Sequence, residues 1–151
     1  MMDLQAAIGI HQLAKLARFQ KKREELFALY RERLRDVEEI LLPEDAAYPS
    51  VHSRHLFLAF LDIDRVNVTR EEFRAKLRDL NVGTGLHYTA VHLFSHYRER
   101  LGHRRGTFPN AEWVSDRVFS LPLMTRMGEG EVNAVVDALK EVLSTTRKGA
   151  R

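Results

Sequence analysis

The most constraining feature of the sequence is an apolar pattern with helical spacing that runs from residue 3 to about residue 38. Its apolar residues recur every three or four positions, as on one face of a helix, and they include Leu4, Ile8, Leu16, Phe27, Tyr30 and Leu34. The first proline is Pro43, so no proline interrupts the pattern. We therefore predict one long helix over about 3–38, with Asp3 as its N-cap and Gly9 or the neighbourhood of Gln20 as the places where it could bend.

This helix is too long for the rest of the chain to cover. At about 1.5 Å per residue it would extend for about 54 Å. A compact chain of 151 residues has a radius of gyration of about 15 Å and hence a diameter of about 38 Å. The first half of the pattern, LQAAIGIHQLAKLARF, is strongly apolar. We expect a surface outside this chain, either a partner subunit or another domain, to cover it.

The remaining sequence predicts short strands separated by single helices. The segment SRHLFLAFLDI, residues 53–63, has the apolar and aromatic density of a strand buried on both faces. Thr69 and Glu72 form a capping box that starts a helix at about residue 70. The further elements expected are a strand over 82–88 whose glycines mark a close backbone approach, a short helix ending at Gly102, a helix over about 109–119, a strand over 120–123, and a last helix opened by Gly128 and Glu131.

This order indicates an α+β fold, with a small sheet and helices packed on one side of it. We predict that residues 1–151 form a single domain that includes the long helix. Hydrophobic residues make up 44% of the chain and charged residues 30%, which is typical of a globular protein and not of a disordered one.

Composition also excludes several classes of function. The absence of cysteine rules out disulfides, thiolate catalysis and cysteine-based zinc sites. The basic clusters at 18–23 and 103–105 could touch phosphate, but the net charge is only +3 and acidic neighbours pair with the basic residues on helices, so we expect no nucleic acid as a partner. No run of 18 apolar residues could cross a membrane, and the first residues lack the features of a secretory signal. We expect a cytoplasmic protein.

The stretch NVGTGLHYTAVHLFSHYRERLG, residues 81–102, holds three histidines and two tyrosines. His92 and His96 are four residues apart, as two zinc ligands on one helix would be, but a third ligand and the glutamate of an HExxH signature are missing. We interpret them as structural and predict no metal site. Ser95 is not surrounded by the strand–turn–helix elbow of a serine nucleophile. The glycines of GTG, residues 83–85, follow a helix instead of opening one, so the helix dipole has the wrong sign for binding phosphate.

His87 is a candidate for acid–base chemistry or substrate contact, together with Tyr88. It follows a short predicted strand, where a side chain can project into a cleft, and an imidazole can exchange a proton near neutral pH. A purely structural histidine fits the same spacing. The residues by themselves leave both interpretations open and indicate no particular reaction.

Three stretches of the sequence resemble the DegT/StrS family of pyridoxal-phosphate-dependent sugar aminotransferases. MDLQAAIGIHQLAKLARFQKKR (2–23) is similar to the helix that follows the family's active-site loop, whereas GTGLHYTAVHLFSHYRERLG (83–102) and FPNAEWVSDRVFSLPL (108–123) resemble its C-terminal domain. The stretches come in the family's order, and the resemblance covers nearly the whole chain. It implies the small C-terminal domain of a fold-type I transferase, a homodimer, and transfer of an amino group from glutamate to a keto-sugar nucleotide.

The resemblance also implies what this chain lacks. The family's large domain carries the Schiff-base lysine, the acid facing the pyridine nitrogen and most phosphate contacts, whereas Lys15 and Lys76 lie in helical patterns and do not match that lysine. We therefore expect no catalytic residue here, and no pyridoxal phosphate bound by this chain alone. His87 and Tyr88 match the family's G-x-H-Y stretch and are the expected substrate contacts. The alternative is a non-catalytic interaction or dimerisation module, or one half of a split enzyme.

Overall fold

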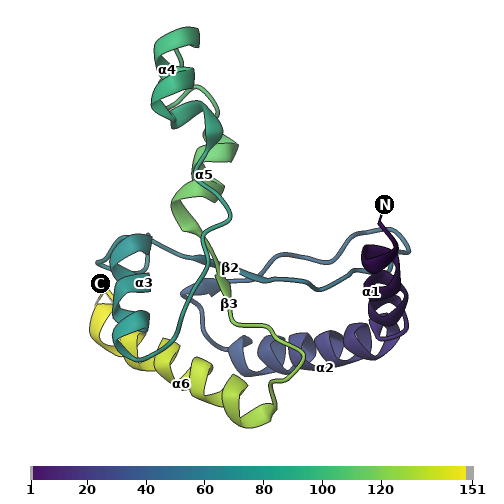
Figure 1. Cartoon of the computed structure of the whole chain (residues 1–151). Helices are drawn as coiled ribbons and strands as arrows, with labels where there is room; N and C mark the ends of the chain where they lie inside the picture. Colours follow the sequence, from purple (N-terminus) through teal and green to yellow (C-terminus); the bar gives the residue numbers. More distant parts are fainter. Residues whose placement is uncertain (1, 149–151) are drawn as a thin grey trace.

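The computed structural model describes residues 2–148 and confirms the α+β class (Figure 1). Within those residues it has six α-helices, a short 3-10 helix and one three-stranded sheet. The elements are α1 (Asp3–Leu13), α2 (Leu16–Leu34), β1 (Ile40–Leu41), β2 (Phe57–Leu61), α3 (Arg70–Asp79), η1 (Val91–Leu93), α4 (Ser95–Leu101), α5 (Pro109–Arg117), β3 (Val118–Leu121) and α6 (Glu129–Thr146). None of the described helices is long and apolar enough to span a bilayer.

The prediction of one continuous helix over 3–38 is wrong, because the pattern forms two helices. A turn at Ala14 and Lys15 separates α1 from α2, and α2 ends at Leu34. At this turn the Lys15 backbone N–H donates to the carbonyl of Gln12, three residues back, instead of continuing the α-helical ladder. The chain bends there, and α1 turns away from the axis of α2 (Figure 1). Neither Gly9 nor Gln20 is the site of the bend.

The N-cap of α1 is Met2 and not Asp3, which lies in the first turn of the helix. The Gln5 side chain accepts a hydrogen bond from the Met2 backbone N–H at 3.0 Å and so satisfies the donor of the N-cap residue. In the first turn the carboxylate of Asp3 still faces the positive end of the helix dipole.

The sheet is antiparallel in the order β1-β2-β3, and its core face is covered by helices. Phe57, Ala59 and Leu61 alternate onto this face, where Phe57 packs against the α2 rings of Phe27 and Tyr30 at centroid distances of 4.8 and 4.7 Å. Figure 1 shows α2, α3 and α6 together on this side. The expected one-sided packing needs one correction: α5 lies against the opposite face, where its Trp113 contacts the Phe60 ring at 5.5 Å.

Several boundaries depend on contacts that are distant in sequence. The expected strand over 53–63 is confined to Phe57–Leu61, and the expected strand over 82–88 is reduced to a single bridge between Gly85 and Ser120. The strand expected over 120–123 begins two residues earlier, at Val118. The helix starts set by local chemistry are confirmed, since the Thr69 backbone N–H donates to Glu72 Oε2 at 2.7 Å and Gly128 precedes α6.

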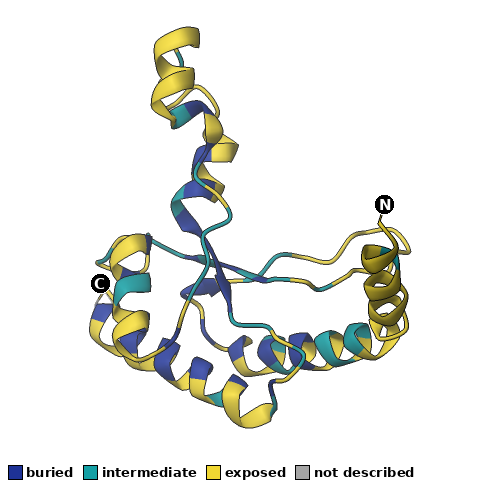
Figure 2. Ribbon diagram, in the orientation of Figure 1, coloured by how far each residue is buried: buried dark blue, intermediate teal, exposed yellow. Residues whose placement is uncertain are grey.

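Residues 91–117, which we call the arm, extend away from the body of the molecule (Figure 1). The arm contains η1, α4, the loop after Gly102, and α5. Gly102 ends α4 with a left-handed φ of 68°, as the sequence predicts. No residue of α4 is buried, and Figure 2 shows the tip of the arm exposed on the sides in view.

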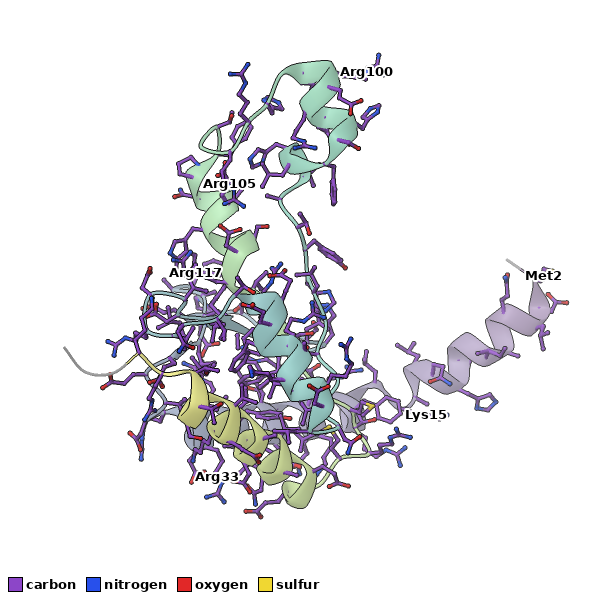
Figure 3. All side chains as sticks on the ribbon, turned by 90° about the vertical axis from the view of Figure 1, so that its left-hand side faces the viewer. Met2, Lys15, Arg33, Arg100, Arg105 and Arg117 are labelled. Carbon is purple, nitrogen blue, oxygen red and sulfur yellow. The ribbon has the colours of Figure 1, made fainter. Side chains whose placement is uncertain are left out.

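The first helix is also uncovered. No residue of α1 is buried, and its apolar side chains together with Leu16 are between 52% and 70% exposed: Leu4, Ile8, Ile10, Leu13 and Leu16. Figure 3 shows α1 projecting from Lys15 at the junction to Met2 at its far end. The rest of the described chain therefore leaves this apolar helix uncovered.

Candidate functional site

The segment around His87 is fastened to β3 by a backbone bridge. Gly85 donates to the Ser120 carbonyl at 3.0 Å, and the Ser120 N–H donates to the Gly85 carbonyl at 2.9 Å. Two residues further on, the His87 ring returns to the same serine, with Nε2 2.9 Å from Ser120 Oγ. A Cβ on Gly85 would lie 2.5 Å from His87 Nε2 and 2.6 Å from Ser120 Oγ. Only glycine leaves room for this contact, which confirms the close backbone approach predicted for one of the two glycines.

Both ring nitrogens of His87 are turned inward. Nε2 is bonded to Ser120, and Nδ1 is buried without a hydrogen-bond partner in the part of the chain described. A buried N–H without a partner is rarer in proteins than a buried lone pair without one. The favoured tautomer therefore carries its hydrogen on Nε2, which donates to Ser120 Oγ and leaves the lone pair on Nδ1.

Tyr88 has the opposite character. It follows His87 through a cis peptide bond, and the two rings meet edge to face at 5.1 Å. Its side chain is 73% exposed. Of the two predicted site residues, the structure presents Tyr88 to solvent and anchors His87 beneath it. Residues 84–90, which we call the 84–90 turn, thus carry an exposed phenol next to a histidine that is bonded to β3.

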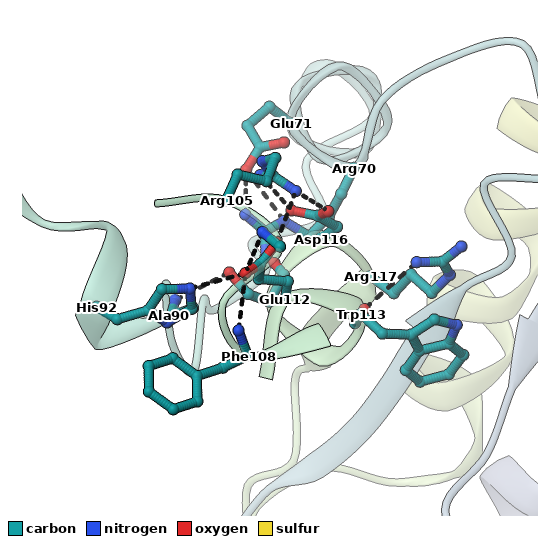
Figure 4. Close-up of polar contacts among 12 residues, drawn as sticks. Arg70, Glu71, Ala90, His92, Arg105, Phe108, Glu112, Trp113, Asp116 and Arg117 are labelled. Atoms are coloured by element: carbon teal, nitrogen blue, oxygen red, sulfur yellow. Dashed lines mark hydrogen bonds and ion pairs between the residues drawn. The ribbon is translucent and has the colours of Figure 1, made fainter. Parts of the chain in front are cut away.

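A hollow of about 640 Å³ lies beside the 84–90 turn, between the start of α3 and the base of the arm. Among its lining residues are Thr69, Arg70, Thr89, Arg105, Ser115 and Asp116. Both arginines already have partners. Arg70 donates to the backbone carbonyls of Ser115 and Val118 and to Glu71, and Arg105 donates to both oxygens of Asp116, at 2.7 and 3.1 Å. Figure 4 shows these pairs, which neutralise the positive charge that a phosphate would need.

The second histidine of the sequence pattern has a structural role. His92 is buried, and its Nε2 lies 2.9 Å from Glu112 Oε1. Glu112 also accepts hydrogen bonds from the backbone N–H groups of Gly106 and Phe108, and these bonds, that of Gly106 above all, lower its pKa (Figure 4). His96 lies on a different element, α4, and is exposed. Within residues 2–148 no three His, Asp or Glu side chains are placed to hold a metal ion.

The comparison with known proteins decides the family. The family model described as "DegT/DnrJ/EryC1/StrS aminotransferase family" matches residues 1–140. The chain belongs to this family. It is 39% identical over 147 residues to "Uncharacterized protein MJ1066" of Methanocaldococcus jannaschii, covering 97% of this chain and 38% of that protein. It is 34% identical over 147 residues to "Spore coat polysaccharide biosynthesis protein SpsC" of Bacillus subtilis, covering 95% and 37%.

Two solved structures share the fold of this chain. S. venezuelae DesV, solved in complex with a ketimine intermediate, superposes with a TM-score of 0.78 at 30% identity, covering 91% of this chain and 35% of that one. The PLP form of the putative sugar aminotransferase Spr1654 from Streptococcus pneumoniae gives a TM-score of 0.84 at 21% identity, which shows the fold alone; it covers 96% and 36%. The chain therefore spans less than two fifths of the length of these relatives.

Pyridoxal phosphate is a cofactor of the family, but the residues of this chain do not fit its covalent attachment. A Schiff-base lysine must lose its proton, which requires a desolvated site or a neighbouring positive charge. The chain has six lysines, and none of them is buried: Lys15, Lys21, Lys22, Lys76, Lys140 and Lys148. None of them lines the hollow beside the 84–90 turn. We therefore derive no chemical step through the cofactor from this chain.

Proposed function

We propose that this chain is the small, C-terminal domain of a cytoplasmic, pyridoxal-phosphate-dependent sugar aminotransferase, and that the cofactor is held by a large domain outside these 151 residues. The observation that carries the proposal is a match to the aminotransferase family over residues 1–140 in a chain without a buried lysine. The uncovered apolar face of α1 and the start of α2 supports it, since that face suits contact with the large domain or with a dimer partner.

In the complete enzyme the reaction would move an amino group from glutamate to a keto-sugar nucleotide. We assign binding to this chain, and not the chemical step. The 84–90 turn, with His87 and Tyr88, would contact the nucleotide sugar. As the substrate of the complete enzyme we propose the keto-sugar that yields UDP-4-amino-4-deoxy-L-arabinose, because the sequence motifs resemble the aminotransferase that makes this sugar.

Two measurements test the proposal. The chain is first incubated with pyridoxal phosphate and reduced with borohydride, and its mass is measured. We expect scattered, substoichiometric labelling of exposed lysines and no turnover. One stoichiometric adduct on a single lysine, with an absorbance band that reduction removes and with transaminase turnover, would contradict the proposal.

The second measurement tests whether the 84–90 turn binds a nucleotide sugar. Millimolar UDP-glucose is added to the ¹⁵N-labelled chain, and we expect the largest amide shift changes within residues 84–90. Changes confined to another surface, or no change at saturating concentration, would remove the assigned role of His87 and Tyr88.

A dimerisation module is the second candidate, and the exposed apolar side chains of α1 favour it. Light scattering with and without pyridoxal phosphate separates the two functions. A dimer that forms without the cofactor supports the module, whereas a monomer or open-ended aggregation indicates that the natural cover of α1 is missing.

A further inference from the structure

We propose that Ser120 is a positioning residue which acts through His87, and that Tyr88 alone makes the turn's hydrogen bond to the nucleotide sugar. This inference rests on the proposed function, because it assigns separate roles, positioning and ligand contact, to residues of the 84–90 turn and their neighbour. It assigns a role to a serine that the sequence did not single out, 33 positions away from the histidine it holds.

His87 has no ring nitrogen available for a hydrogen bond to a ligand. Its Nε2 already bonds to Ser120 Oγ at 2.9 Å, and its Nδ1 is buried and faces no partner. A sugar hydroxyl that approached from solvent would have to displace Ser120 to reach Nε2, and it could not reach the buried Nδ1. His87 can therefore contribute the placement of the turn, but not a hydrogen bond to the ligand.

Ser120 is itself fixed. It is buried in β3, pairs with Leu58 of β2 on one side, and exchanges two backbone hydrogen bonds with Gly85 on the other. Its hydroxyl therefore sits at a defined point of a rigid strand. A side chain supported in this way holds a binding group more accurately than a loop can.

The Tyr88 ring packs against the His87 ring in a T-shaped arrangement, with the two ring centroids 5.1 Å apart. The rest of the tyrosine is mostly solvent-exposed, so without that contact the ring would sample several rotamers. Holding the ring in place beforehand reduces the entropy lost on binding and so strengthens binding. The phenol can both donate and accept, which suits the hydroxyl groups of a sugar.

The four tyrosines of the chain supply internal controls for a test by ¹⁹F NMR with fluorotyrosine. Tyr30 is fully buried, and Tyr48 is 71% exposed on a loop away from the turn. We expect Ser120→Ala to move the Tyr88 signal toward that of a free exposed tyrosine and to leave Tyr30 and Tyr48 unchanged. The unchanged Tyr30 signal shows that the variant is folded.

Two further variants separate positioning from a general structural effect. Ser120→Thr keeps the hydroxyl and should keep the Tyr88 signal, whereas Gly85→Ala places a methyl group against His87 and should move the signal as Ser120→Ala does. A Tyr88 signal that stays in place in folded Ser120→Ala, or that moves equally in Ser120→Thr, would overturn the inference.

Titration with UDP-glucose then tests whether Ser120 positions Tyr88 for ligand binding. We expect Ser120→Ala and Tyr88→Phe each to weaken binding at least fivefold, and Ser120→Thr to bind as the unmodified chain does. Equal binding by Ser120→Ala would contradict the inference. If UDP-glucose does not perturb the turn of the unmodified chain, the proposed function fails instead, and the ligand-free ¹⁹F spectra still decide whether Ser120 positions Tyr88.

Discussion

Tyr30 connects the second helix to the segment after β3, and its replacement by phenylalanine should have an effect whose size depends on pH. Its side chain is 0% exposed, and its hydroxyl donates to the Pro122 carbonyl at 2.9 Å. Tyr30→Phe keeps the ring packing against Phe57 and leaves that carbonyl without its partner. We expect the free energy of unfolding at pH 7 to fall by about 1–2 kcal/mol.

Alkaline pH should remove this difference in stability. Burial raises the pKa of Tyr30 above the ordinary value of 10.0. Above about pH 10 the unfolded chain therefore releases this proton while the folded chain retains it, and the unmodified protein loses about 1.4 kcal/mol of stability per pH unit. By about pH 11 this loss matches the effect of the substitution, so the two proteins should be about equally stable. The two proteins share every other ionisable group, so the contributions of those groups cancel in the comparison.

The assay is urea denaturation followed by circular dichroism at pH 7, 9, 10 and 11. Tyr48→Phe is the matched control, because Tyr48 is 71% exposed and its replacement should change stability by less than about 0.5 kcal/mol. Stability curves for Tyr30→Phe and the unmodified chain that run parallel from pH 7 to pH 11 would refute the reasoning.

Three further predictions concern the arm, the caps and the open helix. Glu112→Gln should raise the rate of amide hydrogen exchange at Gly106, because the charged acceptor of that N–H is lost. In the unmodified chain the same amide should lose protection only as the pH falls below 4.5, because the lowered pKa of Glu112 keeps its carboxylate charged above that value. An exchange rate equal in both proteins would contradict this. Thr69→Ala removes the N-cap of α3 and should lower the free energy of unfolding by about 1 kcal/mol, measured by urea denaturation. Leu4→Glu combined with Leu13→Glu changes two exposed side chains, so it should reduce self-association in light scattering without lowering the melting temperature; a drop of several degrees would show that α1 packs on the body.

Local chemistry made several elements predictable. The capping box of Thr69 and Glu72, the left-handed Gly102 and the opening at Gly128 each act within a few residues of the feature they specify. The family also followed from short motifs with the right order. These features are predicted correctly because their hydrogen bonds join residues close in sequence and do not depend on distant parts of the chain.

The wrong or missing predictions have two causes. Some features depend on contacts between residues distant in sequence, and one helix is interrupted where no glycine or proline indicates it. The turn at Ala14 and Lys15 contains neither glycine nor proline, and the apolar period continues across it, so the sequence shows no reason for it. The His87 contact to Ser120 joins two segments whose approach depends on the pairing of β2 with β3. The glycine-rich stretch before His87 was the available signal, because it indicated a close approach without naming the partner.

Helix α5 passes into β3 without a connecting loop, since Arg117 ends the helix and Val118 begins the strand. Side chains of a strand alternate between its two faces, so one residue inserted at this junction would exchange those faces. Ser120 would turn toward the helices, and Phe119 would turn out of the core. Length variation in natural relatives should therefore be absent at this junction and should accumulate in the loop over 102–108. The positions of insertions and deletions in an alignment of relatives would thus reveal the junction between α5 and β3 independently of the structure.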